Sequence, residues 1–507
     1  MDVGAPITQA PPFTLLTQLV GDPDQLEIFS ERGAIESWLA VERALALAQA
    51  EHGILTDDEA VAIASAARYD NVDRARLWGS ARNVGYPILG LVGEIGRSLG
   101  RHDAGRVHFG ATTQDIMDSG LALQIVRSVG ALDRDLGLLG DAVARRAVEH
   151  AHTVMPARTH GQQAVPTTFG ATLGTLLAEL TRHRARLAEG RARLSVVSLF
   201  GAGGTAAALG PRSREVRASV ARLLRLRDPG VSWHVGRDVV AEFGWLCTTV
   251  TATCARFARN IVDLSRTEIG EVFEPYATHR GASSTMPQKA NPISSEILIG
   301  LAGTAGSLAS SLARIQEAGH ERAAGEWQIE WQVLPQLAVL AGSALKEATT
   351  LADGMRVDAR RMRANLDLDG GLVMAEAQMM RLADDIGHDV AHDLVYTAAH
   401  RARERGGGLA DALYEAAGAR GRPDLLRAPL PTPESHLGEA ATAVRTAVDQ
   451  WSRTPPGAPE PDPPVAGLAT TGPRPPVPGA ASPDPPHLRS ESLVAQKHAA
   501  SEIESRS

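Results

Sequence analysis

Apolar residues recur at helical spacing along most of this 507-residue chain. Residues 35–51 (IESWLAVERALALAQAE) show the pattern clearly, because Ala, Leu and Glu favour helices and apolar side chains return every three or four positions. The same pattern covers five further segments, namely 120–151, 167–195, 239–268, 294–318 and 331–351. Alternation of apolar and polar residues, which is typical of strands, is scarce. The pattern therefore predicts an all-α fold.

The predicted helices are long and rich in small residues. The chain has 49 glycines and only 4% aromatic residues, so the backbones of neighbouring helices can approach closely in a bundle. Helices of this length also expose more apolar surface than one chain can cover. We therefore expect a central bundle of long helices that assembles into an oligomer.

Three breaks interrupt the helical pattern. Residues 108–115 (HFGATTQD) and 281–292 (GASSTMPQKANP) are rich in Gly, Thr, Ser and Pro, and a third change falls near 353–369. These breaks predict three helical domains: residues 1–111, residues 112–360 with the loop 281–292, and residues 361–452.

The C-terminal segment, residues 453–507, has a different composition. Thirteen of the 30 prolines fall between Pro455 and Pro486, a density that excludes helix and sheet. We expect this segment to be an extended or disordered tail, dispensable for the rest of the chain.

Composition excludes several classes of protein. The formal net charge of −8 argues against a nucleic-acid binder, and two cysteines, Cys247 and Cys254, are too few for a disulfide scaffold. We expect these cysteines to be packing residues. The N-terminus has no signal-peptide pattern, and no run of about twenty apolar residues stands out as a membrane span. The sequence therefore predicts a cytoplasmic protein without membrane or nucleic-acid partners.

The loop 281–292 and the helix after it carry the most specific segment, GASSTMPQKANPISSE. Its glycine-led start presents two adjacent hydroxyls, Ser283 and Ser284, followed by Lys289 and Asn291. Lys289 is one of only three lysines beside 48 arginines, which suggests that this position needs a compact ammonium group. The ordered combination S-S-x-M-P-x-K-x-N is too particular for an ordinary solvated loop.

The loop resembles the signature of the fumarase/aspartase superfamily, which includes argininosuccinate lyase, adenylosuccinate lyase and 3-carboxymuconate cycloisomerase. Residues 110–115 (GATTQD) and 157–170 (ARTHGQQAVPTTFG) resemble two further motif regions of that family, in the same order. The resemblance covers about residues 30–450. It implies a homotetramer whose active sites combine the three regions from different subunits.

The resemblance also implies a reaction and its groups. A proton leaves a carbon next to a carboxylate, and donors stabilise the dianion that forms. The general base is Ser283, with Ser284 as the competing assignment, and loop amides and Lys289 must stabilise the alkoxide because a free serine is too weak a base. His160 pairs with Glu296 and donates a proton or holds a carboxylate.

The remaining candidate residues bind the substrate, a small dicarboxylate. These residues are Thr112, Thr113, Gln162, Ser284, Met286, Asn291 and Arg237. Arg158 is a secondary candidate, and Arg237 has a second interpretation as an interhelical salt bridge. No cluster has metal-ligand spacing and no glycine-rich phosphate loop follows a strand, so we expect neither a metal nor a cofactor.

The substrate class follows from which groups are present. Residues 320–331 (HERAAGEWQIEW) resemble the cycloisomerase branch, and the acidic residues in this stretch are unsuited to a nucleotide phosphate. Bacterial cycloisomerases that resemble this chain usually carry tryptophan where it has His160, which suggests true elimination. We therefore expect a β-elimination that releases a nitrogen group from a substituted succinate to give fumarate, with nitrosuccinate as the most compatible substrate.

Two alternatives remain. One is a cycloisomerase that closes a lactone on the same scaffold. The other is a non-enzymatic protein resembling the lens crystallins of this fold, although the retained Ser283, Lys289 and His160 argue against it.

Overall fold

A single 37-residue helix, α8 (Thr113–Glu149), runs through the centre of the fold. The computed structural model describes residues 15–427 and 429–455. Leu132, Leu136, Leu139 and Val143 of α8 are buried at helical spacing, and they form one apolar stripe of the main core. This stripe allows other long helices to pack along α8.

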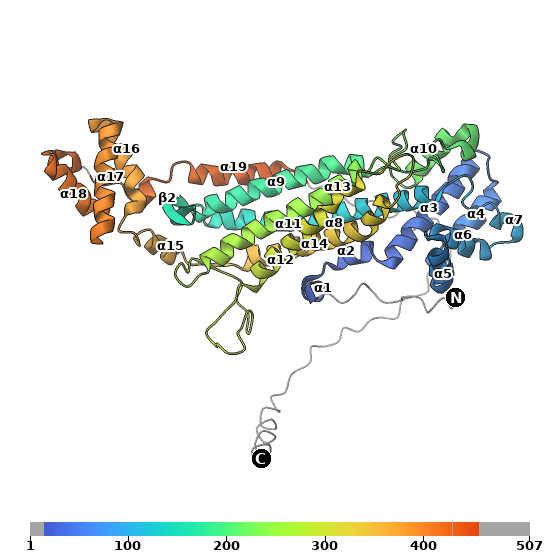
Figure 1. Cartoon of the computed structure of the whole chain (residues 1–507), viewed down its shortest axis with the longest axis horizontal. Coiled ribbons are helices and arrows are strands. Elements are labelled where there is room, and N and C mark those ends of the chain that lie inside the picture. Colours follow the sequence, from blue (N-terminus) through green and yellow to red (C-terminus); the bar gives the residue numbers. More distant parts are fainter. Residues whose placement is uncertain (1–14, 428, 456–507) are drawn as a thin grey trace, which may run out of the picture. The chain divides into compact units, whose positions relative to one another are not determined.

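Five further helices complete the central bundle (Figure 1). They are α9 (Phe169–Leu194), α11 (Asp238–Leu264), α12 (Ile293–Ala309), α14 (Glu326–Gly354) and α19 (Ala440–Arg453). Helices α9 and α14 pack on α8, and α11 packs against α9, α12 and α14. The short helix α13 (Ser311–Ile315) follows α12 and also contacts α11 and α14. The bundle therefore joins segments far apart in the sequence.

Seven α-helices precede α8 in the described part of the chain, and several of them contribute to a second hydrophobic core. The seven are α1 (Leu15–Val20), α2 (Pro23–Ile28), α3 (Glu31–Glu51), α4 (Asp57–Ala66), α5 (Arg74–Val84), α6 (Ile88–Arg97) and α7 (Arg101–Ala104). Among them, α3 to α6 contribute residues to the second core. Leu39, Leu77 and Leu91 form part of this core together with Val216 and Val220 of α10 (Ser213–Leu223), a later segment. The N-terminal core therefore includes residues from beyond position 111.

A third core lies in the C-terminal region. Helices α15 (Ala359–Asn365), α16 (Ala375–Ile386), α17 (His388–Arg405) and α18 (Leu409–Ala419) follow α14. Leu382, Leu394 and Leu413 lie in this core, between α16, α17 and α18. The chain then returns to the bundle, because α19 packs on α9 and α8.

The all-α prediction is confirmed, with one local difference. Residues 167–168 do not belong to the helix expected over 167–195, because they end a hairpin of β1 (Val154–Thr159) and β2 (Gln162–Thr168). β-branched residues and Pro166 favour an extended backbone here, so α9 begins only at Phe169. A second short pair joins β3 (Val272–Phe273) to β4 (Arg356–Val357).

Both cysteines are buried free thiols on α11, as their expected packing role requires. Burial raises the pKa of both thiols, and that of Cys254 reaches about 12. Neutral thiols of this kind behave as small apolar residues in the bundle core.

The stretch Ile293–Ile315 is long and apolar enough, by length and composition, to cross a membrane. Its most apolar window has a mean hydropathy of 1.3, and 22% of that window is buried. This stretch covers α12 and α13, which pack on α11 and α14. The absence of a membrane partner stays a prediction.

Two further sequence predictions concern the chain's organisation. The expected tail lies outside the described residues from position 456 onward. The division into domains at 1–111, 112–360 and 361–452 stays a prediction, although α8 begins at the first proposed boundary. Val444 and Trp451 of α19 enter the main core, so the last segment is not independent of the bundle.

Trp451 anchors α19 to the bundle, and its removal tests this packing. Its ring covers Gly140 of α8, where a Cβ would collide with it, and its Nε1 donates to Asp141 Oδ1 at 2.8 Å. We expect Trp451→Ala to lower the free energy of unfolding by about 3–5 kcal/mol in urea denaturation, because a buried aromatic ring is lost. Trp245→Ala, at a tryptophan that is 48% exposed, is the control and should change stability much less. Equal losses in both variants would contradict the anchoring role.

Candidate active site

The Thr112–Thr113 pair lies where α8 begins. Thr112 is the N-cap residue with an extended backbone, and Thr113 is the first helical residue. Both are half-buried, so their hydroxyls and amides lie at the edge of the protein interior. A helix N-terminus offers unpaired N–H groups and a positive dipole end, which suits a carboxylate.

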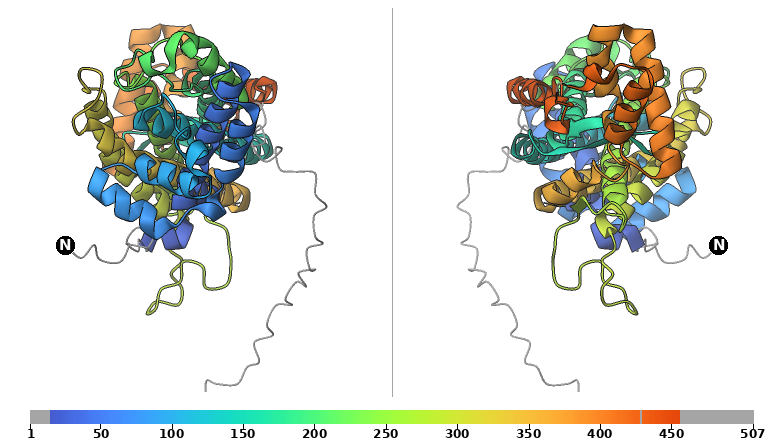
Figure 2. Two further views of the ribbon diagram at one scale, coloured as in Figure 1. Left: turned by 90° about the vertical axis from the view of Figure 1, so that its right-hand side faces the viewer. Right: turned by 90° about the vertical axis from the view of Figure 1, so that its left-hand side faces the viewer.

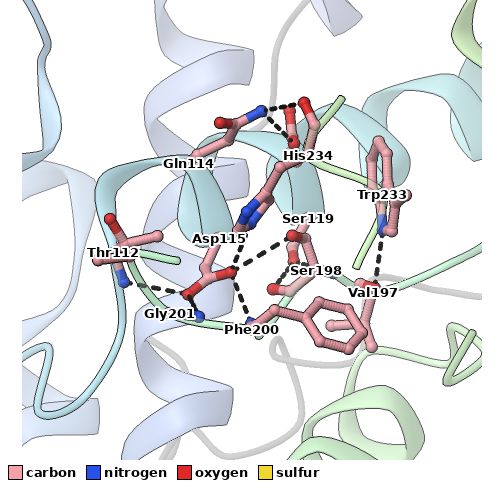
Figure 3. Close-up of polar contacts among 12 residues, drawn as sticks. Thr112, Gln114, Asp115, Ser119, Val197, Ser198, Phe200, Gly201, Trp233 and His234 are labelled. Carbon is pink, nitrogen blue, oxygen red and sulfur yellow. Dashed lines mark hydrogen bonds and ion pairs between the residues drawn. The ribbon is translucent and has the colours of Figure 1, made fainter. Parts of the chain in front are cut away.

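A buried carboxylate, that of Asp115, holds this helix start in place (Figure 3). Asp115 accepts hydrogen bonds from the backbone N–H groups of Thr112 (3.0 Å), Phe200 (2.8 Å) and Gly201 (2.9 Å). His234 Nε2 lies 3.0 Å from the same carboxylate. One side chain therefore connects α8, the loop after α9 and the segment before α11.

The electrostatics of Asp115 follow from these contacts. Burial by itself would raise the pKa of Asp115, but the hydrogen bonds from His234 and from backbone N–H groups of Phe200 and Thr112 hold it below its ordinary value. Because the side chain is fully buried, its charge depends on these donors.

Arg237, the N-cap residue of α11, lies in a second buried network beside Asp115. Its guanidinium donates to Glu330 of α14 at 2.7 Å and to Asp118 of α8 at 3.0 and 3.1 Å. A further N–H points to the carbonyl of Trp233, so all five N–H groups face protein acceptors. Burial raises the pKa of Glu330 above its ordinary value. This arrangement favours the salt-bridge interpretation of Arg237.

His160 lies at the tip of the β1–β2 hairpin. The turn consists of His160 and Gly161, with φ of 51° and 77°, which is typical of a two-residue hairpin turn. His160 and the neighbouring Gln162 are exposed. Arg158 on β1 is bonded to the buried Glu271 at 2.9 and 2.5 Å, so it fixes the hairpin to the chain near β3.

The loop 281–292 projects away from the helices between β3 and α12 (Figures 1 and 2). Within it, Ser283 Oγ accepts hydrogen bonds from the backbone N–H groups of Met286 (3.1 Å) and Thr285 (3.3 Å). Backbone N–H donors are the kind of group that would stabilise an alkoxide at Ser283, whose role as the base stays a prediction.

Backbone contacts join the two ends of the loop 281–292. Asn291 N–H donates to the Gly281 carbonyl at 2.8 Å, and Ala282 pairs with Ala290 as an isolated bridge. Gly281 has φ of 66°, and a Cβ there would collide with the Asn291 carbonyl, so only glycine fits. Ser284, Met286 and Lys289 are exposed beyond this closure, where other groups can reach them.

A single chain does not bring these regions together. A 37-residue helix is about 55 Å long, so the Thr pair and the hairpin lie at opposite ends of α8. Glu296 is exposed in the first turn of α12 and does not bond to His160. Among residues 15–427 and 429–455, no hydrogen bond or ion pair joins the Thr pair, His160 and the loop 281–292.

Sequence reasoning missed Asp115 and His234 as supports of the Thr pair. Asp115 belongs to the motif region GATTQD, and His234 lies three residues before the candidate Arg237, yet neither was singled out. The available signal was the spacing of Thr112 and Asp115, in which an acidic residue three positions after a threonine indicates a helix start. The contact with His234 has no sequence signal.

Replacing Asp115 tests its role in holding the helix start. We expect Asp115→Asn to lower the free energy of unfolding by about 1.5–3 kcal/mol at pH 7, because charge-assisted hydrogen bonds are lost. Since the folded pKa is lowered, the stabilisation is present above the unfolded value of about 3.9 and disappears as the pH falls through the folded value.

Urea denaturation at pH 7 and below pH 4 measures this difference between the wild-type chain and the variant. Asp449→Asn, at an exposed position on α19, is the matched control and should change little at either pH. A constant difference between wild type and Asp115→Asn at all pH values would contradict the electrostatic explanation.

Comparison with protein families identifies two matching regions. Residues 20–305 match the family model described as Lyase, and residues 371–447 match the one described as Adenylosuccinate lyase C-terminus. The first match covers more than half of the chain.

Individual relatives are similar over most of their length. The chain is 42% identical to the 3-carboxy-cis,cis-muconate cycloisomerase of Pseudomonas aeruginosa over 427 residues, which is 83% of this chain and 93% of that protein. The crystal structure of the 3-carboxy-cis,cis-muconate lactonizing enzyme from Pseudomonas putida matches with a TM-score of 0.79 and 38% identity, covering 87% of this chain and 99% of that one. A fumarate lyase structure from Mesorhizobium sp. BNC1 matches with a TM-score of 0.78 and 37% identity, covering 85% and 98%.

These relatives correct the expected reaction. Elimination of a nitrogen group from a substituted succinate, with nitrosuccinate as the substrate, is wrong, because several similar proteins are cycloisomerases that form a lactone. The presence of His160 and Glu296 was taken to indicate an elimination, but these two side chains do not determine the leaving group of the reaction. The motif regions, the fold and the full-length similarity agree, and the chain belongs to the fumarate lyase superfamily, the same superfamily that its loop signature resembles.

Proposed function

We propose that this protein is a cycloisomerase that converts 3-carboxy-cis,cis-muconate, or a closely related unsaturated tricarboxylate, into a lactone. The observation that carries this proposal is the full-length similarity to cycloisomerases, at 42% identity in the P. aeruginosa enzyme.

The reaction is an isomerisation in which no atom is lost. A carboxylate oxygen of the substrate forms a bond to one carbon of a double bond, and a proton adds to the neighbouring carbon. In the reverse direction, a base removes a proton from the carbon next to a carboxylate. The C–O bond of the lactone ring then breaks, and the ring oxygen leaves as part of a carboxylate. Both directions pass through a carbanion whose charge spreads into that carboxylate, so fixed donors are the main catalytic requirement.

In this proposal, Ser283 exchanges the proton with carbon. Its oxygen accepts hydrogen bonds from two backbone N–H groups of the same loop, and these donors favour the alkoxide form of the side chain. Lys289 and Asn291 of the same loop supply further donors to the substrate dianion, and the Thr112–Thr113 pair binds a second carboxylate at the start of α8.

Lactone closure also gives His160 a different role from the one first expected. The attacking group is a carboxylate that is already ionised, so no proton has to be moved at the oxygen that forms the new bond. We assign His160 and Gln162 to holding a substrate carboxylate at the hairpin tip, where both are exposed in the single chain.

We further propose that the enzyme is a homotetramer with composite sites. The Thr pair and the hairpin lie at opposite ends of a rigid helix, so only other subunits can supply the missing groups to each site. Exposed glycines at positions 300, 303 and 306 leave one side of α12 open to close approach by another helix.

The choice of substrate tests the proposed reaction. We expect purified protein to consume 3-carboxy-cis,cis-muconate and form its lactone, followed by ultraviolet absorbance. Adenylosuccinate, argininosuccinate and nitrosuccinate serve as controls and should give no fumarate. Fumarate from any of these compounds, with no lactone from the muconate, would overturn the proposal.

The two loop serines and His160 test the assigned roles. We expect Ser283→Ala to lower kcat by about 10²–10⁴-fold, because proton exchange with carbon is lost. His160→Ala should raise KM and change kcat by less than about tenfold, because it moves no proton. Ser284→Ala is the matched control, and light scattering should show the same assembly for all variants. A larger loss in Ser284→Ala than in Ser283→Ala would move the base to Ser284.

A further inference from the structure

Helix α17 carries a row of ring side chains on its exposed face. His388, His392, Tyr396 and His400 follow one another at intervals of four residues. The three histidine side chains are 62%, 57% and 60% exposed. The other face of the helix, with Leu394 and Ala398, is buried in the C-terminal core. The helix is therefore held by its apolar face while this row faces solvent.

Each of the first two histidines is followed by an aspartate, and the contact between the two side chains is similar in both pairs. His388 Nδ1 lies 3.5 Å from Asp389 Oδ1, and His392 Nδ1 lies 3.5 Å from Asp393 Oδ1. These are loose ion-pair contacts, because the side chains of Asp389 and Asp393 are 105% and 75% exposed, and they leave Nε2 of each ring available as a ligand. Histidines that bind metals usually direct their second ring nitrogen to a carboxylate in this way.

The spacing of the pair suits a single cation. Side chains four residues apart on a helix have Cβ atoms about 5–6 Å apart, and two histidines at this interval form the metal-binding half of known helical zinc motifs. Imidazole nitrogen is a preferred ligand for zinc, copper and nickel ions. The ring of His392 is also oriented by Tyr396, which stacks on it at 6.2 Å and 15°.

We propose that His388 and His392 bind one divalent transition-metal ion of the zinc class through their Nε2 atoms, at a surface site distinct from the candidate active site. Asp389 and Asp393 lie beside the rings and add negative charge near the ion, and water completes the coordination. The expectation that no cluster has metal-ligand spacing overlooked the His-x-x-x-His spacing of residues 388–392 (HDVAH). The exposure of both side chains is known only from the structure.

A second group with ligand atoms close together consists of Glu59, His102 and Asp103. It is a poorer site for a cation, because Arg106 Nε lies 3.7 Å from Glu59 and the same carboxylate accepts from the backbone of Thr56 at 2.8 Å. His102 therefore provides a control for unspecific binding elsewhere on the surface.

The test is titration of the full chain, without an affinity tag, with zinc chloride in an isothermal calorimeter. We expect saturable binding with one high-affinity ion per chain, and a zinc-dependent rise in Tm. His388→Ala and His392→Ala should each abolish both effects, and Asp389→Asn should weaken binding about 10–100-fold. The substituted side chains are exposed, so the variants should fold as the wild-type chain does.

Matched controls lie on the same helix and at the competing cluster. His400→Ala should bind zinc like the wild-type chain, because His400 has Tyr396 and not a histidine four residues before it. His102→Ala should also be unchanged, whereas Tyr396→His should allow a second zinc ion to bind, because residues 396 and 400 would then form another histidine pair four residues apart. Absence of saturable binding, or binding that survives both His388→Ala and His392→Ala, would overturn the proposal.

Discussion

The buried carboxylate of Asp115 is the contact on which the candidate site depends most. A charge that is removed from water must be compensated, and here backbone N–H groups from two separate segments and the ring of His234 compensate it. The same bonds fix the first turn of α8 against the loop at Phe200. The position of the Thr112–Thr113 pair therefore depends on the buried side chain of Asp115.

The length of α8 imposes the second constraint. A continuous helix cannot fold back to bring its two ends together, so groups placed at its start and beyond its end serve different sites. Arg158 ties β1 to Glu271, the residue before β3, and the chain runs on from β3 to the loop 281–292. This division explains why the candidate site residues do not come together within the described part of a single chain.

Much of the fold could be predicted from the local pattern of apolar residues. Less of the candidate active site could be predicted in this way. Apolar periodicity identified the bundle helices, but it extended α9 backwards over residues 167–168, because an alanine- and threonine-rich stretch is compatible with both helix and strand. The signature around Ser283 identified the loop 281–292 and the superfamily, while the catalytic role of its residues stays a prediction. The partnership of Asp115 with His234 spans 119 positions and depends on burial, which no local pattern records. The reaction itself was misassigned because the presence of His160 in the sequence does not determine which bond the enzyme breaks or forms.

The turn at His160 also limits how this site can change. A left-handed backbone costs an ordinary residue about 1–2 kcal/mol, while asparagine, aspartate and histidine tolerate it better than bulky or branched residues. An exchange of the imidazole for a large ring would therefore act on the conformation of the hairpin tip as well as on its chemistry. Divergence towards a new substrate at this position would require the turn and the side chain to change together.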